Sequence, residues 1–262
     1  MALPSLDHWD TTRDSLHRAS EVLGALRKAF IKPQPNALHL ALEVTPTGLT
    51  TGELSGGNEF WLDFTQATLN YRESRGRVTT VELQNNTPQA ALIAVVSAMP
   101  TIHMGVTQLV TRGGLNTIPL AIDKAQSADY AEALYRITTA FNNFRAGLKG
   151  MLTPLVVWPH GFDLSMLWFP GDNPDEQTQP HCNFGFSPGS AGLPRPYFYG
   201  YVWPRPDDLT SAPLPAPVRW HTEGWTGALV EYDAIRNEAQ PEIVIQSLLE
   251  QIYQVLAVRI PS

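Results

Sequence analysis

Cysteine, charged residues and long apolar runs are all scarce in this sequence, and each shortage excludes a class of protein. Cys182 is the single cysteine among 262 residues, so no disulfide can form within the chain and a reducing compartment is expected. No apolar run approaches the roughly 18–20 residues that a membrane-spanning helix needs. The first residues show no basic stretch followed by an apolar one, so we expect no secretory signal. These absences predict a cytoplasmic protein with no membrane partner.

The charge of the chain argues against nucleic acid as its partner. Charged residues make up 16% of the sequence and the formal net charge is −7, whereas a nucleic-acid-binding protein normally presents a basic face. The lysines and arginines are scattered, and a cluster forms only at Arg72, Arg75 and Arg77, around Gly76 in a predicted turn. We interpret this cluster as a solvated loop and exclude nucleic acid as the default partner.

Four segments have the three- and four-residue apolar spacing of helices. They are residues 12–30, 88–99, 128–149 and 241–258. Thr11 and Asp14 have the spacing of an N-terminal capping box before the first helix. Pro88 occupies the favoured first position of the second helix, which is apolar nearly all round and is therefore predicted to be buried.

Alternating apolar residues and turn residues predict antiparallel strands in both halves of the chain. They are expected at residues 37–44, 48–54, 59–64, 67–73, 77–83, 105–111, 153–158, 162–169, 182–187, 197–203 and 226–231. Prolines concentrate in the loops between Pro154 and Trp225. The sequence thus predicts an α+β fold, with antiparallel sheet, amphipathic helices packed on it and Pro-rich loops in the C-terminal half. We expect a single domain over residues 1–262, or two tightly fused sheet-plus-helix halves, 1–125 and 126–262.

Several short phrases follow one another along nearly the whole chain. They are Trp9-Asp10-Thr11-Thr12 leading to Ser15-Leu16-His17-Arg18, Asn36-Ala37-Leu38-His39, Gly48-Leu49-Thr50-Thr51, Gly161-Phe162-Asp163-Leu164, and Pro196-Tyr197-Phe198-Tyr199 followed by Pro204 and Pro206. In this order they resemble a bacterial family catalogued only as a domain of unknown function. That family has an N-terminal TLH helix, an NHWWH strand, a GLTT turn, a W-G-S-F-D-L hairpin and a late FY-x-Y-x-P strand. The resemblance implies one bacterial cytoplasmic domain and implies no reaction.

The chain departs from this family pattern at three places. The segment from Asn36 to His39 keeps only the ends of NHWWH, and Pro159-His160 changes the hairpin before Phe162. The residues before Pro188 lack the acidic and serine residues of the family pattern. If those residues form a site in the family, the chemistry of this chain differs there.

A polar pair in the predicted hairpin at residues 158–163 is the first candidate site. His160 and Asp163 fall within hydrogen-bond reach across the expected turn, and a carboxylate raises the basicity of an imidazole. They are therefore candidate catalytic residues. The alternative is that both side chains satisfy turn amides.

The strand at residues 197–203 carries the second candidate. Alternation places Tyr197, Tyr199, Tyr201 and Trp203 on one face, which suits the lining of a ligand cleft. Packing in the core, with the hydroxyls at its rim, is the alternative. Arg195 and Arg205 flank this row and are candidate ligands for a carboxylate or phosphate, with surface salt bridges as the commoner outcome.

Histidines supply weaker candidates. His17 lies beside the apolar stripe of the first helix and His39 on the polar face of its predicted strand. Both are candidates to line a shared cleft, and the alternative is that they are surface residues. The seven histidines show no H-x-H or H-x-x-x-H spacing, so no metal is predicted. The weak alternative is a dispersed site of His160, Asp163 and His181. No Gly-rich phosphate loop occurs, and no cofactor is predicted.

One phrase, Gly185-Phe186-Ser187-Pro188-Gly189, matches the G-x-S-x-G nucleophile elbow of α/β-hydrolases, and Asp207 and His221 follow in the expected order. The elbow uses the backbone N–H after the serine as an oxyanion donor, and Pro188 has none. We therefore interpret the phrase as an ordinary turn.

Taken together, these patterns predict a protein that binds or processes a small molecule of unknown class in an aromatic-lined cleft. A non-catalytic protein–protein interaction module and a metal-dependent enzyme with a dispersed His/Asp site are the alternatives. Whether the chain is an enzyme, and its oligomeric state, are left open by the sequence.

Overall fold

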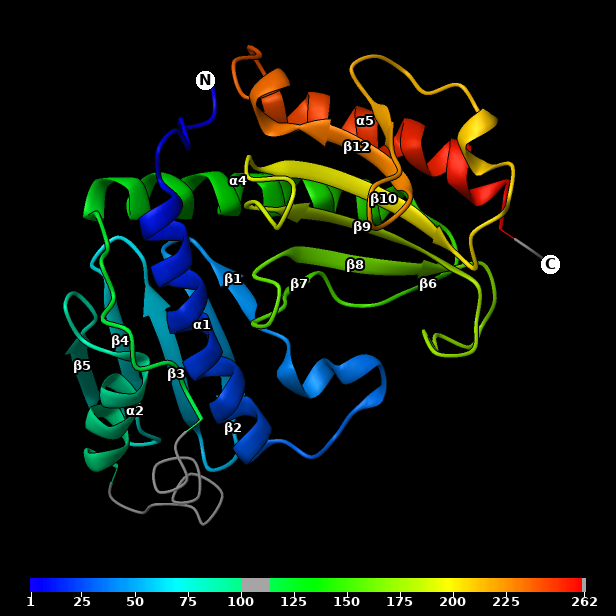
Figure 1. Cartoon of the computed structure of the whole chain (residues 1–262). Coiled ribbons are helices and arrows are strands. Elements are labelled where there is room, and N and C mark those ends of the chain that lie inside the picture. Colours follow the sequence, from blue (N-terminus) through cyan, green and yellow to red (C-terminus); the bar gives the residue numbers. More distant parts are fainter. Residues whose placement is uncertain (100–113, 261–262) are drawn as a thin grey trace. The chain divides into compact units, whose positions relative to one another are not determined.

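The computed structural model describes residues 1–99 and 114–260 (Figure 1). The strand expected at residues 105–111 and His103 lie outside these residues. The chain forms two compact units. Unit 1 comprises Met1–Pro4, Arg136–Val156 and Asp163–Ser262, and unit 2 comprises Ser5–Tyr135 and Val157–Phe162. Both units combine helices with antiparallel sheet, so the α+β prediction is confirmed.

Unit 2 is built on a five-stranded antiparallel meander in the order β1-β2-β3-β4-β5. Its elements are α1 (Asp10–Phe30), η1 (Pro35–Leu40), β1 (Glu43–Thr45), β2 (Gly48–Leu54), β3 (Asn58–Asp63), β4 (Thr68–Arg72), β5 (Val78–Glu82) and α2 (Pro88–Ser97). The helix α1 packs against β2 and β3, because its stripe of Leu16, Leu23 and Leu26 is fully buried. Phe60 and Leu62 of β3 are buried, whereas Trp61 between them is half-buried, as alternation along a strand requires.

Three local expectations in unit 2 are wrong. The segment expected as a strand at residues 37–44 is a strand only at its end, where β1 begins at Glu43. Residues 37–40 belong to the 3-10 turn η1, with backbone φ angles of 51° at Asn36 and 52° at Ala37. Thr11 makes no capping box, because α1 begins at Asp10 with Trp9 in the capping position. The helix α2 is not buried all round, since Ile93 is 41% exposed. Its Thr87 does accept a hydrogen bond from Ala90 N–H and caps the helix.

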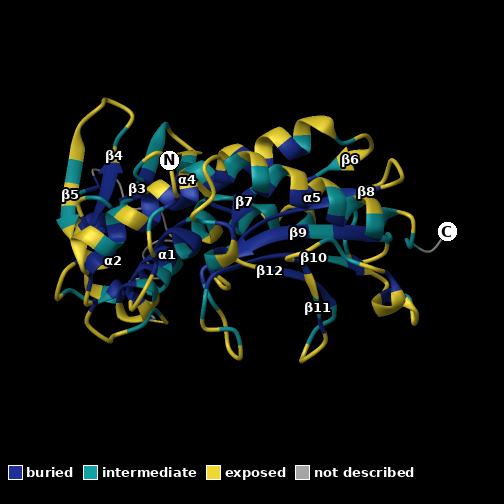
Figure 2. Cartoon of the chain, turned by 90° about the horizontal axis from the view of Figure 1, so that it is seen from above, coloured by how far each residue is buried: buried dark blue, intermediate teal, exposed yellow. Residues whose placement is uncertain are grey.

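Unit 1 is built on a larger antiparallel sheet in the order β11-β12-β10-β9-β8-β6, with β7 paired to β8 off this path. Its elements are β6 (Met151–Leu152), β8 (Leu164–Phe169), β9 (His181–Ser187), β10 (Tyr197–Trp203), η2 (Leu209–Ser211), β11 (Arg219–His221), β12 (Gly227–Glu231), η3 (Tyr232–Ala234) and α5 (Pro241–Ala257). The chain passes from unit 1 to unit 2 within β7 (Val156–Val157). The central strands are largely buried (Figure 2). The strand β11 was not expected from the sequence, because three residues are too few to show alternation.

The helix α4 (Lys124–Gly147) contributes to both cores. In unit 2 its Tyr130 is buried, with its ring centroid 4.7 Å from that of Trp9. In unit 1 its Phe141 and Phe144 are buried and contact Phe198 and Phe184 of the sheet. Within the described residues, no helix has the length and apolarity that crossing a membrane would require.

Candidate functional site

The two faces of β10 have different surroundings. Phe198 and Gly200 face the helices of unit 1, where a Cβ on Gly200 would lie 2.8 Å from Ile252 of α5. Tyr197, Tyr199 and Tyr201 project from the opposite face, and we call these three residues the tyrosine row. The rings of Tyr199 and Tyr201 are stacked, with centroids 6.2 Å apart and an interplanar angle of 9°. The alternation that the sequence predicts is thus present in the sheet.

Trp225 lies against the whole tyrosine row. Its ring centroid is 6.3 Å from that of Tyr197, 6.0 Å from Tyr199 and 6.4 Å from Tyr201. Trp225 comes from the turn between β11 and β12, and β12 pairs directly with β10. Gly227 makes the approach possible, because a Cβ there would lie 2.7 Å from the Trp225 ring. Pairing between distant segments, rather than local sequence, therefore brings this indole to the row.

Tyr199 reaches across the sheet to Asp163. Its hydroxyl donates a hydrogen bond of 2.5 Å to Asp163 Oδ2 at the start of β8. The ring crosses Gly185 of the intervening strand β9, where a Cβ would overlap the tyrosine ring and lie 2.7 Å from the Leu164 carbonyl oxygen. Burial raises the pKa of Tyr199 well above its usual value, and the Asp163 charge raises it further, while a hydrogen bond with Ser165 acts in the opposite direction. Tyr199 is thus a neutral hydrogen-bond donor held between strands.

Tyr201 is the next member of the row and has a polar partner of its own. Asn183 Nδ2 donates to the Tyr201 hydroxyl at 2.8 Å. Burial raises the pKa of Tyr201 above its usual value, the hydrogen bond with Asn183 lowers it, and the charges of Asp163 and Glu176 raise it. Within the described residues, Asn183 Oδ1 is buried without a hydrogen-bond partner, so this end of the row has unused hydrogen-bonding capacity.

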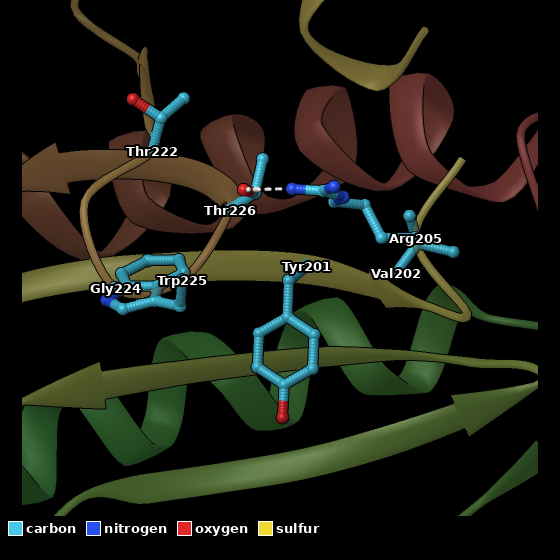
Figure 3. A pocket seen from close by; sticks show the side chains of 7 residues that line it. All are labelled: Tyr201, Val202, Arg205, Thr222, Gly224, Trp225 and Thr226. Atoms are coloured by element: carbon cyan, nitrogen blue, oxygen red, sulfur yellow. Dashed lines mark hydrogen bonds between the residues drawn. The ribbon is translucent and has the colours of Figure 1, made fainter. Parts of the chain in front are cut away.

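A pocket of about 320 Å³ opens beside Tyr201 (Figure 3). It is lined by Tyr201, Val202, Arg205, Thr222, Gly224, Trp225 and Thr226. The end of β10 and the loop after it supply one wall, and the β11–β12 turn supplies the other. Arg205 donates to Thr226 Oγ1 at 3.0 Å, which links the two walls. The turn itself is held by His221, whose ring lies 4.6 Å from that of Trp225 and whose Nε2 is 2.7 Å from the Glu223 carbonyl oxygen.

Trp203, predicted on the same face as the three tyrosines, and Arg195, predicted to flank them, have other surroundings. Trp203 is 41% exposed and stacks on His181 of β9, with ring centroids 5.5 Å apart. Arg195 forms an ion pair with Asp233, with donor–acceptor distances of 2.5 and 2.9 Å. Neither residue lines the pocket. Of the residues predicted to bind a ligand, Tyr201 and Arg205 are the two that line it.

The predicted histidines His17, His39 and His160 belong to unit 2. The His17 ring stacks on Phe162 at 5.4 Å, and its Nε2 lies 3.0 Å from the Pro159 carbonyl oxygen. His39 Nδ1 accepts a hydrogen bond of 3.3 Å from the Gln34 N–H. His160 is exposed, and its ring is tilted against that of Trp158. Each histidine therefore has a local partner within its own unit.

Phe162, the partner of His17, has a strained backbone. Its φ is 57°, a left-handed conformation that is rare for a bulky residue. The ring is buried and also contacts Phe64 and Tyr130. These contacts offset the strain.

The structure also describes the candidate nucleophiles Ser187 and Cys182 and the candidate metal ligands. Ser187 is buried and its Oγ accepts a hydrogen bond from Gly189 N–H, as expected for a turn. Cys182 is buried, and burial raises the pKa of its thiol. Within residues 1–99 and 114–260, no three His, Cys, Asp or Glu side chains form a group that could hold a metal ion. The structure accordingly does not assemble His160, Asp163 and His181 into one cluster.

The sequence reasoning missed five pocket residues. One is Val202, which alternation along β10 assigns to the face opposite Tyr201. The other four are Thr222, Gly224, Trp225 and Thr226. These four occupy a turn, where no periodicity marks a face, and β11 before them is only three residues long. The concentration of tryptophan in this part of the chain was the available signal, but it does not select Trp225.

The chain belongs to DUF5996, a family of unknown function, whose family model matches residues 2–260. The resemblance drawn from the sequence phrases is thereby confirmed. Neither the curated proteins nor the solved structures include a match to the chain.

Proposed function

We propose that this chain binds a small molecule in the pocket between the end of β10 and the β11–β12 turn. The observation that carries the proposal is the lining, which combines the aromatic side chains of Tyr201 and Trp225 with the charged side chain of Arg205. Binding sites for small molecules typically combine apolar and aromatic walls with a few placed polar groups. The volume of about 320 Å³ lies at the low end of the usual range, roughly 300–1,000 Å³.

The residues behind the pocket support a preformed site. Tyr201 is held by Asn183, and its neighbour Tyr199 is held by Asp163. A side chain that is already fixed in its bound position loses less conformational entropy when a ligand arrives. In this proposal Asp163 positions the tyrosine row. Acid–base catalysis by Asp163 together with His160 remains a separate prediction.

A protein–protein interaction module is the alternative function. It is favoured by the exposure of Trp203, because tryptophan is enriched at the centre of protein interfaces. Trp203 is not part of the pocket, so substitutions can separate the two functions.

The test is a thermal-shift screen of small metabolites on the wild type and two variants. Thr222→Phe adds bulk at an exposed position that lines the pocket, and Thr210→Phe adds the same bulk at an exposed position outside it. A ligand at about 100 times its Kd stabilises the folded state by about 2.7 kcal/mol. We expect that stabilisation in the wild type and in Thr210→Phe, and its loss in Thr222→Phe.

Two results would count against the pocket. If a stabilising ligand acts equally on Thr222→Phe, the site lies elsewhere. If no compound stabilises the wild type, and a stoichiometric protein partner is lost in Trp203→Ala but retained in Thr222→Phe, the interaction module replaces the proposal.

A further inference from the structure

We infer that the ligand of this pocket is an aromatic carboxylate, with its anionic group at Arg205 and its ring against Tyr201 and Trp225. This inference rests on the proposed function and names the ligand class of the same site. Three features support it: the charge of Arg205, the acidic groups that act on Tyr201, and the arrangement of the Tyr201 and Trp225 rings.

Arg205 supplies the charge. Of the described residues that line the pocket, it alone carries one at neutral pH. Its guanidinium donates to the neutral Thr226 hydroxyl and, within the described residues, forms no ion pair with a carboxylate. Two other arginines of unit 1, Arg195 and Arg219, form ion pairs with Asp233 and Glu231. Because a guanidinium carries five N–H donors in a fixed fork, Arg205 retains donors that suit a carboxylate.

Two acidic groups of unit 1 act on the Tyr201 end of the pocket. The charges of Asp163 and Glu176 act on the hydroxyl of Tyr201. An anion beside that hydroxyl would be repelled, whereas an anion beside Arg205 would be attracted. The ligand's negative group is therefore placed at the Arg205 end, and its uncharged part lies toward Tyr201.

The rings favour a planar ligand. The Tyr201 and Trp225 rings are inclined at 60°, with centroids 6.4 Å apart. Figure 3 shows Trp225 at the left and Arg205 at the right, with Tyr201 between them in this view. An aromatic ligand can stack on one ring and meet the other edge-on, the two geometries that aromatic pairs prefer. A saturated ring of similar size fills the volume without these contacts.

The experiment is a calorimetric titration with three matched probes: phenylacetate, its neutral amide phenylacetamide, and the saturated acid cyclohexylacetate. We expect phenylacetate to bind the wild type about tenfold or more tightly than the amide, because a hydrogen bond to a charged group is the stronger one. We expect it to bind about two- to tenfold more tightly than cyclohexylacetate, from the aromatic contacts.

Three variants test whether the carboxylate of the ligand binds at Arg205. Arg205→Gln should abolish the preference for the acid over the amide, and Arg205→Lys should keep part of it because the charge remains. Arg219→Gln is the matched control, with the same charge change at an exposed residue that does not line the pocket. It should keep the full preference. Far-UV circular dichroism confirms that each variant is folded.

The failure of this inference is distinct from that of the proposed function. If acid and amide bind equally, or if Arg205→Gln keeps the preference, the carboxylate assignment is wrong even where Thr222→Phe still blocks binding. If cyclohexylacetate equals phenylacetate, the aromatic assignment is wrong. If none of the three probes binds, the ligand class is overturned, and the thermal-shift screen alone decides whether the pocket binds another class.

Discussion

At the scale of single residues, the hydroxyl of Tyr199 is a tightly held polar group. It is removed from water and donates to Asp163 across β9. Its pKa in the folded protein lies well above the usual value of 10.0, chiefly because burial disfavours the phenolate. The unfolded chain, in contrast, releases this proton near the usual value. Because of this difference, the free energy of unfolding depends on pH in the alkaline range.

The sign of that dependence follows from linkage. A group whose pKa is raised on folding makes its full contribution to the free energy of unfolding below its pKa in the unfolded chain. That contribution declines as the pH rises above this value toward the pKa in the folded protein. We therefore expect the free energy of unfolding to fall above pH 10.0, the usual tyrosine value, and to fall less steeply in Tyr199→Phe. Urea denaturation across this range measures it. Tyr135→Phe, at a ring that is 43% exposed, is the control and should keep the wild-type slope; equal slopes in all three proteins would contradict the prediction.

At the scale of elements, one arginine determines the path of the chain after α1. Arg27 donates to the carbonyl oxygens of Leu38 at 3.0 Å and His39 at 3.3 Å, and also to that of Thr51 in β2. These bonds hold η1 in a compact turn next to the sheet. They also stabilise a segment whose Asn36 and Ala37 have positive φ.

Replacing this side chain should release the turn. In Arg27→Lys the charge stays but the planar fork is lost, so one ammonium cannot serve all the carbonyl groups. We expect faster amide hydrogen exchange over residues 35–41 and a loss of about 1–3 kcal/mol in the free energy of unfolding. Lys28→Met, at the exposed neighbouring position, should change neither. Unchanged exchange in Arg27→Lys would show that the turn does not depend on the guanidinium.

The segment η1 is also a place where the sequence pattern predicts the wrong structure. Leu38 and Leu40 alternate as in a strand, yet they lie in η1, where the Leu38 and His39 carbonyl groups accept hydrogen bonds from Arg27. Alternation did predict the tyrosine row and the meander of unit 2 correctly, since those strands pair with sequence neighbours. It could not predict Trp225, because the pairing of β12 with β10 places that turn residue on the row.

At the scale of the whole molecule, α4 is the element that joins two cores. Its Tyr130 belongs to unit 2 and its Phe141 and Phe144 to unit 1. A continuous helix that loses its packing in one unit also loses support in the other. We therefore predict that the two units unfold together, as the expected single domain requires.

Cys182 provides the measurement for this prediction, because its thiol is buried in unit 1 and reacts only when unfolding exposes it. Leu23→Ala removes a fully buried side chain in unit 2 and should cost about 2–5 kcal/mol. If unfolding is cooperative, this substitution accelerates labelling of Cys182 by a thiol reagent, whereas Lys28→Ala does not. An unchanged labelling rate in Leu23→Ala would mean that unit 1 unfolds independently.

Gly185 restricts which residues relatives of this chain can have at position 199. The glycine leaves the space through which the Tyr199 ring passes on its way to Asp163. A larger residue at position 185 is therefore compatible only with a smaller one at position 199, so the two positions should vary together among relatives. Lineages that lose the glycine should also lose the tyrosine, and with it the selective pressure to keep an acid at position 163.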